Sequence, residues 1–203
     1  MTITVIWEDK RGGNIKGFGP HDLLVSCVAD DWLALRKADN FYSGRALVKP
    51  CVVSVPMKGN GNVINALRQD VSKLRRSGPV CAVLDRDEAQ KLLTSAGLRP
   101  PQCLSGIRTA VPDKAPGDYE LVLLIENMET LIEACCQATR MDMPRSKPSP
   151  DLRDRILGKL AWGDAPARTA VRNAVPSFHR LVKWVTTRLP SAITHRSEPR
   201  PGA

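Results

Sequence analysis

Apolar and polar residues in the first part of the chain follow a repeating order of strand, loop and helix. Residues 2–7 are mostly β-branched or aromatic and stop at charged residues, which predicts a strand that runs into a loop. A loop with several glycines follows, and apolar positions then recur at helical spacing over residues 20–35. The order returns with a strand at 51–55, a glycine loop at 58–62 and a helix at 63–75.

The alternation continues beyond this point. Residues 80–84 form an unbroken apolar run of the kind that is buried on both faces of a parallel sheet. The other predicted elements are a polar turn at 38–44, a helix at 88–96, a weaker strand at 103–111, a strand at 119–125 and a helix at 128–136. The pattern therefore predicts an α/β fold, with a mostly parallel, Rossmann-like sheet flanked by helices. Ligand sites of such sheets form at the carboxyl ends of the strands.

The composition changes after this region, and the change predicts how the chain is divided. We expect an α/β domain over residues 1–140 and a linker over 141–150, where prolines alternate with serine and lysine. Residues 151–190 are predicted to form a basic extension of three short helices, the last of them ending at Leu189. The polar, proline-containing residues 191–203 are expected to be disordered.

Charge is unevenly distributed, and the asymmetry favours an acidic partner. The formal net charge is +9, and from Gln137 onward the chain has 13 Lys/Arg against 5 Asp/Glu. Such an excess favours nucleic acid, DNA or RNA, as the partner. The alternative is that the arginine-rich helices are simply well-solvated surfaces, and the sequence leaves both interpretations open.

The remaining composition narrows the protein class. No apolar run reaches the ~18 residues of a membrane-spanning helix, so we expect a soluble, cytoplasmic protein without a membrane partner. The six cysteines lie mostly in apolar runs and lack the spacing of a zinc site, which favours reduced, buried thiols. The three histidines support no Ser/His/Asp arrangement.

Carboxylates stand at the predicted strand ends. Asp85 and Asp87 follow the apolar run directly, Glu8 ends the first strand, and Glu126 ends a later one. Carboxylates aimed at one point repel each other unless a cation lies between them, and oxygen ligands suit Mg²⁺ or Mn²⁺. The alternatives are that Asp87 caps a helix while Asp85 faces solvent, and that Glu126 is an ordinary first-turn charge.

The order of these motifs resembles the TOPRIM domain of topoisomerases, bacterial primases and OLD-family nucleases. A strand-terminal glutamate precedes a glycine-bearing loop, a middle βα unit and an apolar strand that ends in Asp-x-Asp. Small stand-alone bacterial TOPRIM-like proteins also place a Lys-Gly-Asn loop before an Ala-Leu-Arg helix, as Lys58-Gly59-Asn60-Gly61 precedes Ala66-Leu67-Arg68 here. The family usually has glycine after the glutamate, where this chain has Asp9.

The resemblance implies roles for the acidic residues. Glu8 matches the general acid/base or metal-binding glutamate, and Asp85 and Asp87 match the metal-binding aspartates. Glu126 resembles the later acidic residue with which some OLD-type members bind a second ion. A partner ATPase and a place in bacterial or phage defence or repair are likewise implied by family resemblance alone.

These observations predict a Mg²⁺-dependent nuclease or a related phosphodiester-processing enzyme. Lys10 and Lys58 in strand-end loops and Arg172 and Arg180 in the basic extension are the expected substrate contacts. The alternative is a non-catalytic TOPRIM-like scaffold that binds nucleic acid or a partner protein. Phosphatases and glycosyltransferases with Asp-x-Asp fit less well, since such phosphatases carry the motif on their first strand.

Overall fold

The structure is a computed structural model that describes most of the sheet and of the helices packed on it. The described residues are 2–8, 18–57, 59, 61–63, 66, 78–85, 119–124, 128–142 and 149–197. The predicted helix at 88–96 and the weaker strand at 103–111 lie outside them.

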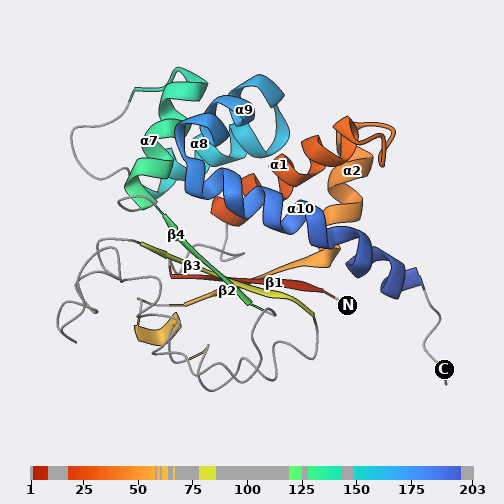
Figure 1. The fold of residues 1–203 in the computed structure, drawn as a ribbon. Coiled ribbons are helices and arrows are strands. Elements are labelled where there is room, and N and C mark those ends of the chain that lie inside the picture. The colour runs from red at the N-terminus through yellow and green to blue at the C-terminus, as the bar shows by residue number, and fades with distance from the viewer. Residues whose placement is uncertain are drawn as a thin grey trace.

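In this part of the chain, four strands form one parallel sheet (Figure 1). The strands are β1 (Ile3–Trp7), β2 (Val52–Pro56), β3 (Val80–Asp85) and β4 (Tyr119–Leu124), in the spatial order β2-β1-β3-β4. All three pairings are parallel, and Val5 lies opposite both Ser54 of β2 and Cys81 of β3. The predicted α/β class with a parallel sheet and helices is confirmed.

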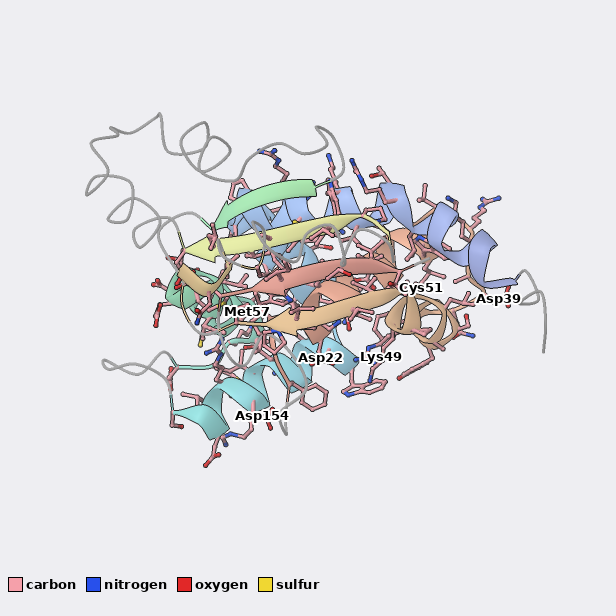
Figure 2. All side chains as sticks on the ribbon, turned by 90° about the horizontal axis from the view of Figure 1, so that it is seen from below. Asp22, Asp39, Lys49, Cys51, Met57 and Asp154 are labelled. Carbon is pink, nitrogen blue, oxygen red and sulfur yellow. The ribbon has the colours of Figure 1, made fainter. Side chains whose placement is uncertain are left out.

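The strand order creates a switch point between β1 and β3. The chain passes from β1 to β2 on one side and then returns to place β3 on the other side of β1. In open α/β sheets, ligands bind outside the carboxyl ends of the strands where the order reverses in this way. The four strands point in the same direction, and Met57, which follows β2, lies at this carboxyl end (Figure 2).

The described helices of more than one turn cover one face of the sheet (Figure 1). They are α1 (Pro20–Ala34), α2 (Phe41–Val48), α7 (Met128–Thr139), α8 (Pro150–Trp162), α9 (Ala165–Ala174) and α10 (Pro176–Ser197), with a short 3₁₀ turn, η1 (Lys49–Cys51), before β2. α1 is the central helix, because it contacts α2, α8, α9 and α10. Its residues from Pro20 to Ala29 are buried all round, which suits a helix enclosed by others on every side.

Helix α2 corrects part of the predicted polar turn at 38–44, because residues 38–40 form the turn and the helix begins at Phe41. Asn40 accepts a hydrogen bond from the Ser43 backbone N–H at 2.9 Å, and the Ser43 hydroxyl oxygen accepts one from the Asn40 N–H at 3.1 Å. This reciprocal capping box starts the helix. Gly44 then packs closely on α1, where an added Cβ would lie 3.4 Å from the Ala29 carbonyl oxygen. The predicted turn thus ends at Asn40, and residues 41–44 form the first turn of a helix.

The basic helices α8–α10 pack into the same core as the α/β part. Phe178, Leu181 and Val185 of α10 are fully buried in one cluster with Val5 of β1 and Leu131 of α7. α10 contacts β1 and β4 and lies across the sheet (Figure 1). The division into domain and extension therefore does not correspond to two separate cores.

α10 also extends further than predicted. It continues to Ser197, so the disordered tail predicted from residue 191 begins too early. The prediction rests on the polar, proline-containing composition of residues 191–203. The turns of α10 that precede this segment are anchored by buried residues up to Leu189.

The cysteine and membrane predictions have clear outcomes within the described residues. Cys27, Cys51, Cys81, Cys135 and Cys136 are buried thiols that form no disulfide bond, as expected. Burial raises the pKa of Cys27 to about 12, which keeps the thiol protonated. Among the described helices, none is long and apolar enough to cross a membrane.

Candidate functional site

Glu8 and Asp85 meet at the switch point of the sheet. Glu8 directly follows β1, and Asp85 is the last residue of the neighbouring strand β3. The Glu8 carboxylate oxygen Oε2 accepts a hydrogen bond from the Asp85 backbone N–H at 2.9 Å. The two acidic residues that the sequence placed at separate strand ends are therefore brought together by the parallel pairing of β1 and β3.

The backbone of Glu8 is held from both sides. Its N–H donates to the carbonyl oxygen of Val83 in β3 at 3.3 Å, and its carbonyl oxygen accepts from the N–H of Gly59 at 3.3 Å. With the side-chain bond to Asp85, Glu8 is fixed at three points. Both Glu8 and Asp85 are partly buried, so the site at the carboxyl end of the sheet is partly accessible to solvent.

This pair fits a divalent cation by its donor chemistry. Mg²⁺ is commonly bound by one or two carboxylates, with water and substrate phosphate completing its coordination. Glu8 and Asp85 supply two oxygen-donor side chains from adjacent strand ends. Among the described residues, however, no group of three His, Cys, Asp or Glu side chains could hold a metal ion.

Several predicted site residues lie outside the described part of the chain. These are Asp87 and Glu126 of the acidic set and Lys10 and Lys58 of the substrate contacts. Their roles stay predictions. Of the predicted acidic residues, the structure describes Glu8 and Asp85 and brings these two together.

The guanidinium of Arg168 is bound by other groups of the protein. Its Nε and Nη2 donate to the Asp30 carboxylate at 2.6 and 2.7 Å, and Nη1 donates to the carbonyl oxygens of Leu160 and Gly163. The guanidinium also lies 4.4 Å from the centre of the Phe41 ring. Since Arg168 is 2 % exposed, its charge is fully engaged inside the protein.

Arg172, a predicted substrate contact, is also engaged by α1. Its Nη1 and Nη2 donate to the Asp31 carboxylate at 2.6 and 3.2 Å. The hydroxyl of Thr186 in α10 donates to the same carboxylate at 3.0 Å. Asp30 and Asp31 of α1 therefore join α9 and α10 to the centre of the fold, a function that no sequence pattern indicated.

The exposed face of α10 carries basic side chains. Arg180 and Lys183 are exposed on the same side of the helix, three residues apart. His179 beside them has a lowered pKa, because burial and the positive charges of Arg172 and Lys183 disfavour its protonation. α10 runs opposite to the strands, so its first turns lie toward the carboxyl end of the sheet (Figures 1 and 2).

Sequence reasoning missed the part that Gly59 plays at this site. The glycine loop is visible as a motif, but its hydrogen bond to the Glu8 carbonyl depends on how β2 is placed beside β1. Comparison of the chain with protein-family models, with curated proteins and with solved structures finds no match in any of the three. The TOPRIM resemblance therefore stays a prediction.

Proposed function

We propose that this protein is a Mg²⁺-dependent nuclease, or a related phosphodiester-processing enzyme, that acts on nucleic acid. The observation that carries the proposal is the meeting of Glu8 with Asp85 at the β1/β3 switch point. Carboxylates at this position of an α/β sheet lie where such folds bind their ligands. The proposed ion is Mg²⁺ or Mn²⁺.

Glu8 and Asp85 would hold the ion through their carboxylate oxygens. A bound divalent ion supplies Lewis-acid stabilisation of charge on phosphodiester oxygens and lowers the pKa of a coordinated water. Glu8 is suited to a fixed role, because its backbone and its Oε2 atom are held by three hydrogen bonds. A preorganised ligand loses little conformational freedom when an ion binds.

The exposed basic residues of α10 would attract the polyanionic substrate. Arg180 and Lys183 are exposed in the first third of α10. The helix itself begins toward the end of the sheet where the strands end (Figure 1). Contacts of this kind bind phosphates without reading the base sequence. Among the described residues, a basic helix start and a carboxylate pair toward the same end of the sheet support the proposal.

Glu8→Gln and Asp85→Asn test the proposal directly. Each substitution keeps the size of the side chain and removes its negative charge, so both should abolish Mg²⁺-dependent cleavage of oligonucleotides while the fold is retained. Asp39→Asn is a matched control, since Asp39 is exposed and lies toward the other end of the sheet (Figure 2). Cleavage that persists in the purified Glu8→Gln, Asp85→Asn double variant would contradict the proposal.

A result without cleavage would still be informative. If the wild-type protein binds oligonucleotides in chelator and cleaves none with Mg²⁺ or Mn²⁺, the non-catalytic scaffold replaces the nuclease. The experiment therefore includes binding in chelator and cleavage in each metal with the same oligonucleotides, as DNA and as RNA.

A further inference from the structure

Gly59 connects the end of β1 to the helical turn that begins at Gly61. Its N–H donates to the Glu8 carbonyl oxygen at 3.3 Å. Its own carbonyl oxygen accepts from the N–H groups of Asn62 at 3.1 Å and Val63 at 3.4 Å. One residue thus fixes the backbone of Glu8 and the start of the next helical segment at once.

The backbone of Glu8 turns where Gly59 holds it. In a regular strand, the N–H and C=O of one residue point toward the same neighbouring strand. Trp7 follows this rule on the β2 side, where its carbonyl oxygen accepts from the Met57 N–H at 2.7 Å. Glu8 does not, because its N–H donates to Val83 of β3 while its carbonyl oxygen faces Gly59 on the β2 side.

This change in the backbone direction at Glu8 determines the position from which its side chain extends. The Glu8 carbonyl has rotated out of the ladder, and Gly59 is the described donor that holds its oxygen. With the backbone in this position, Oε2 of Glu8 reaches the N–H of Asp85 at 2.9 Å. A shift of the Gly59 N–H would therefore move the carboxylate relative to Asp85.

A glycine is required here by conformation and not by space. Gly59 has φ +87°, a region that residues with a Cβ rarely adopt. Apart from its two chain neighbours, no described residue has an atom within 4 Å of a Cβ added at Gly59, so space does not oppose the substitution. Gly61 is equally open but has no positive φ, which makes it a matched control two residues away.

We propose that Gly59 is a positioning residue, which sets the Glu8 carboxylate against Asp85 for metal binding. The inference rests on the proposed function for its purpose, but the geometric part stands on the hydrogen bonds alone. Replacement by alanine forces either a strained backbone or a displaced N–H, and both weaken the hold on Glu8. Asparagine tolerates the left-handed conformation better than alanine does, so Gly59→Asn should retain much of the hydrogen bond to Glu8.

The test compares Gly59→Ala, Gly59→Asn and Gly61→Ala in the full chain. Mn²⁺ affinity is measured by calorimetric titration, and hydrogen exchange of the Asp85 amide is measured by NMR. We expect Gly59→Ala to weaken Mn²⁺ binding about tenfold, equivalent to about 1.4 kcal/mol. The Asp85 amide should also exchange faster in this variant, because Glu8 protects it. Gly59→Asn should lie between Gly59→Ala and wild type, and Gly61→Ala should match wild type.

The two readouts separate this inference from the proposed function. If wild type binds no Mn²⁺, the proposed function fails, and the exchange of the Asp85 amide alone decides the role of Gly59. Equal exchange of that amide in Gly59→Ala and Gly61→Ala would overturn the inference. If Gly59→Ala does not fold, Gly59→Asn is compared with Gly61→Asn instead. The Asp85 amide should exchange faster in Gly59→Asn, and equal exchange in the two variants would overturn the inference.

Discussion

The Glu8 carboxylate accepts a hydrogen bond from the Asp85 backbone N–H at 2.9 Å, which joins residues 77 positions apart in the chain. This contact places two acidic side chains at neighbouring strand ends. Carboxylates at neighbouring strand ends repel each other, and a divalent cation bound by both would offset this repulsion. On the proposed function, the stability of the protein should therefore depend on divalent metal ions.

Mg²⁺ should raise the melting temperature of the wild-type protein. A ligand that binds only the folded state at 100 times its dissociation constant stabilises it by about 2.7 kcal/mol. For a chain of this size the corresponding shift is about 5–10 °C. Thermal denaturation in chelator and in Mg²⁺ measures it, and neither Glu8→Gln nor Asp85→Asn should show the shift. An equal shift in Glu8→Gln would exclude Glu8 as a ligand.

The sheet and its acidic edge could be predicted because their signals are local. Residues 2–7 and 80–84 are short, mostly apolar runs, and Glu8 and Asp85 follow them directly in the sequence. Parallel pairing then brings the ends of adjacent strands to one edge without further information. The contact between Glu8 and Asp85 follows from two such local patterns.

The contacts of Gly59 and Arg168 could not be predicted in the same way. Gly59 is visible in the sequence as a turn residue, but its donor role depends on the placement of β2 beside β1. Arg168 resembles the other arginines of the extension until the packing of α9 on α1 brings it to Asp30. Helix α2 is different, because its Asn40 and Ser43 capping pair is a local signal that the sequence does contain.

Arg168→Ala should destabilise the protein by about 3–5 kcal/mol. The substitution leaves the Asp30 carboxylate and two carbonyl groups without their buried donor. Arg168→Lys should recover only part of this loss, because an ammonium group cannot reproduce the two-pronged geometry. Urea unfolding measures both changes.

Arg188 provides the matched control for Arg168. Its guanidinium also lies over an aromatic ring, 4.4 Å from the centre of Trp184, but the residue is only partly buried. Arg188→Ala should cost about 0.5–1 kcal/mol, the range of a cation–π contact near the surface. A similar loss for Arg168→Ala and Arg188→Ala would show that the ion pair with Asp30 contributes little.

The basic face of α10 should govern the salt dependence of oligonucleotide binding. Replacing Arg180 and Lys183 by serine should lower the slope of log K against log salt by about 2, roughly one for each phosphate that is no longer neutralised. The melting temperature should change little, because both side chains are exposed. The double variant of Arg36 and Lys37, exposed in the turn between α1 and α2, removes the same charge and should leave the slope unchanged.

Acidification should unfold the protein partly through His21. Burial lowers the pKa of His21 from 6.5 to about 4, the nearby charges of Lys49 and Arg45 contribute in the same direction, and Asp22 opposes them. The unfolded state therefore binds the proton more tightly, and stability is lost as the pH falls from 6.5 toward about 4. The full loss is about 3 kcal/mol. Urea unfolding of His21→Gln should show a weaker pH dependence over this window, and an identical slope would contradict the assignment.

Gly158→Ala should destabilise the protein, although alanine normally favours a helix over glycine by about 0.8–1 kcal/mol. Gly158 lies in α8, where an added Cβ would come within 2.7 Å of the Phe18 ring. The Phe18 backbone N–H is bonded to the Asp154 carboxylate of the same helix, so the Phe18 backbone is held beside α8. Crowding of this kind costs about 1–3 kcal/mol. In a Phe18→Ala background the obstacle is gone, and Gly158→Ala should become neutral or stabilising by urea unfolding. Additive effects of the two substitutions would show that the ring does not limit residue 158.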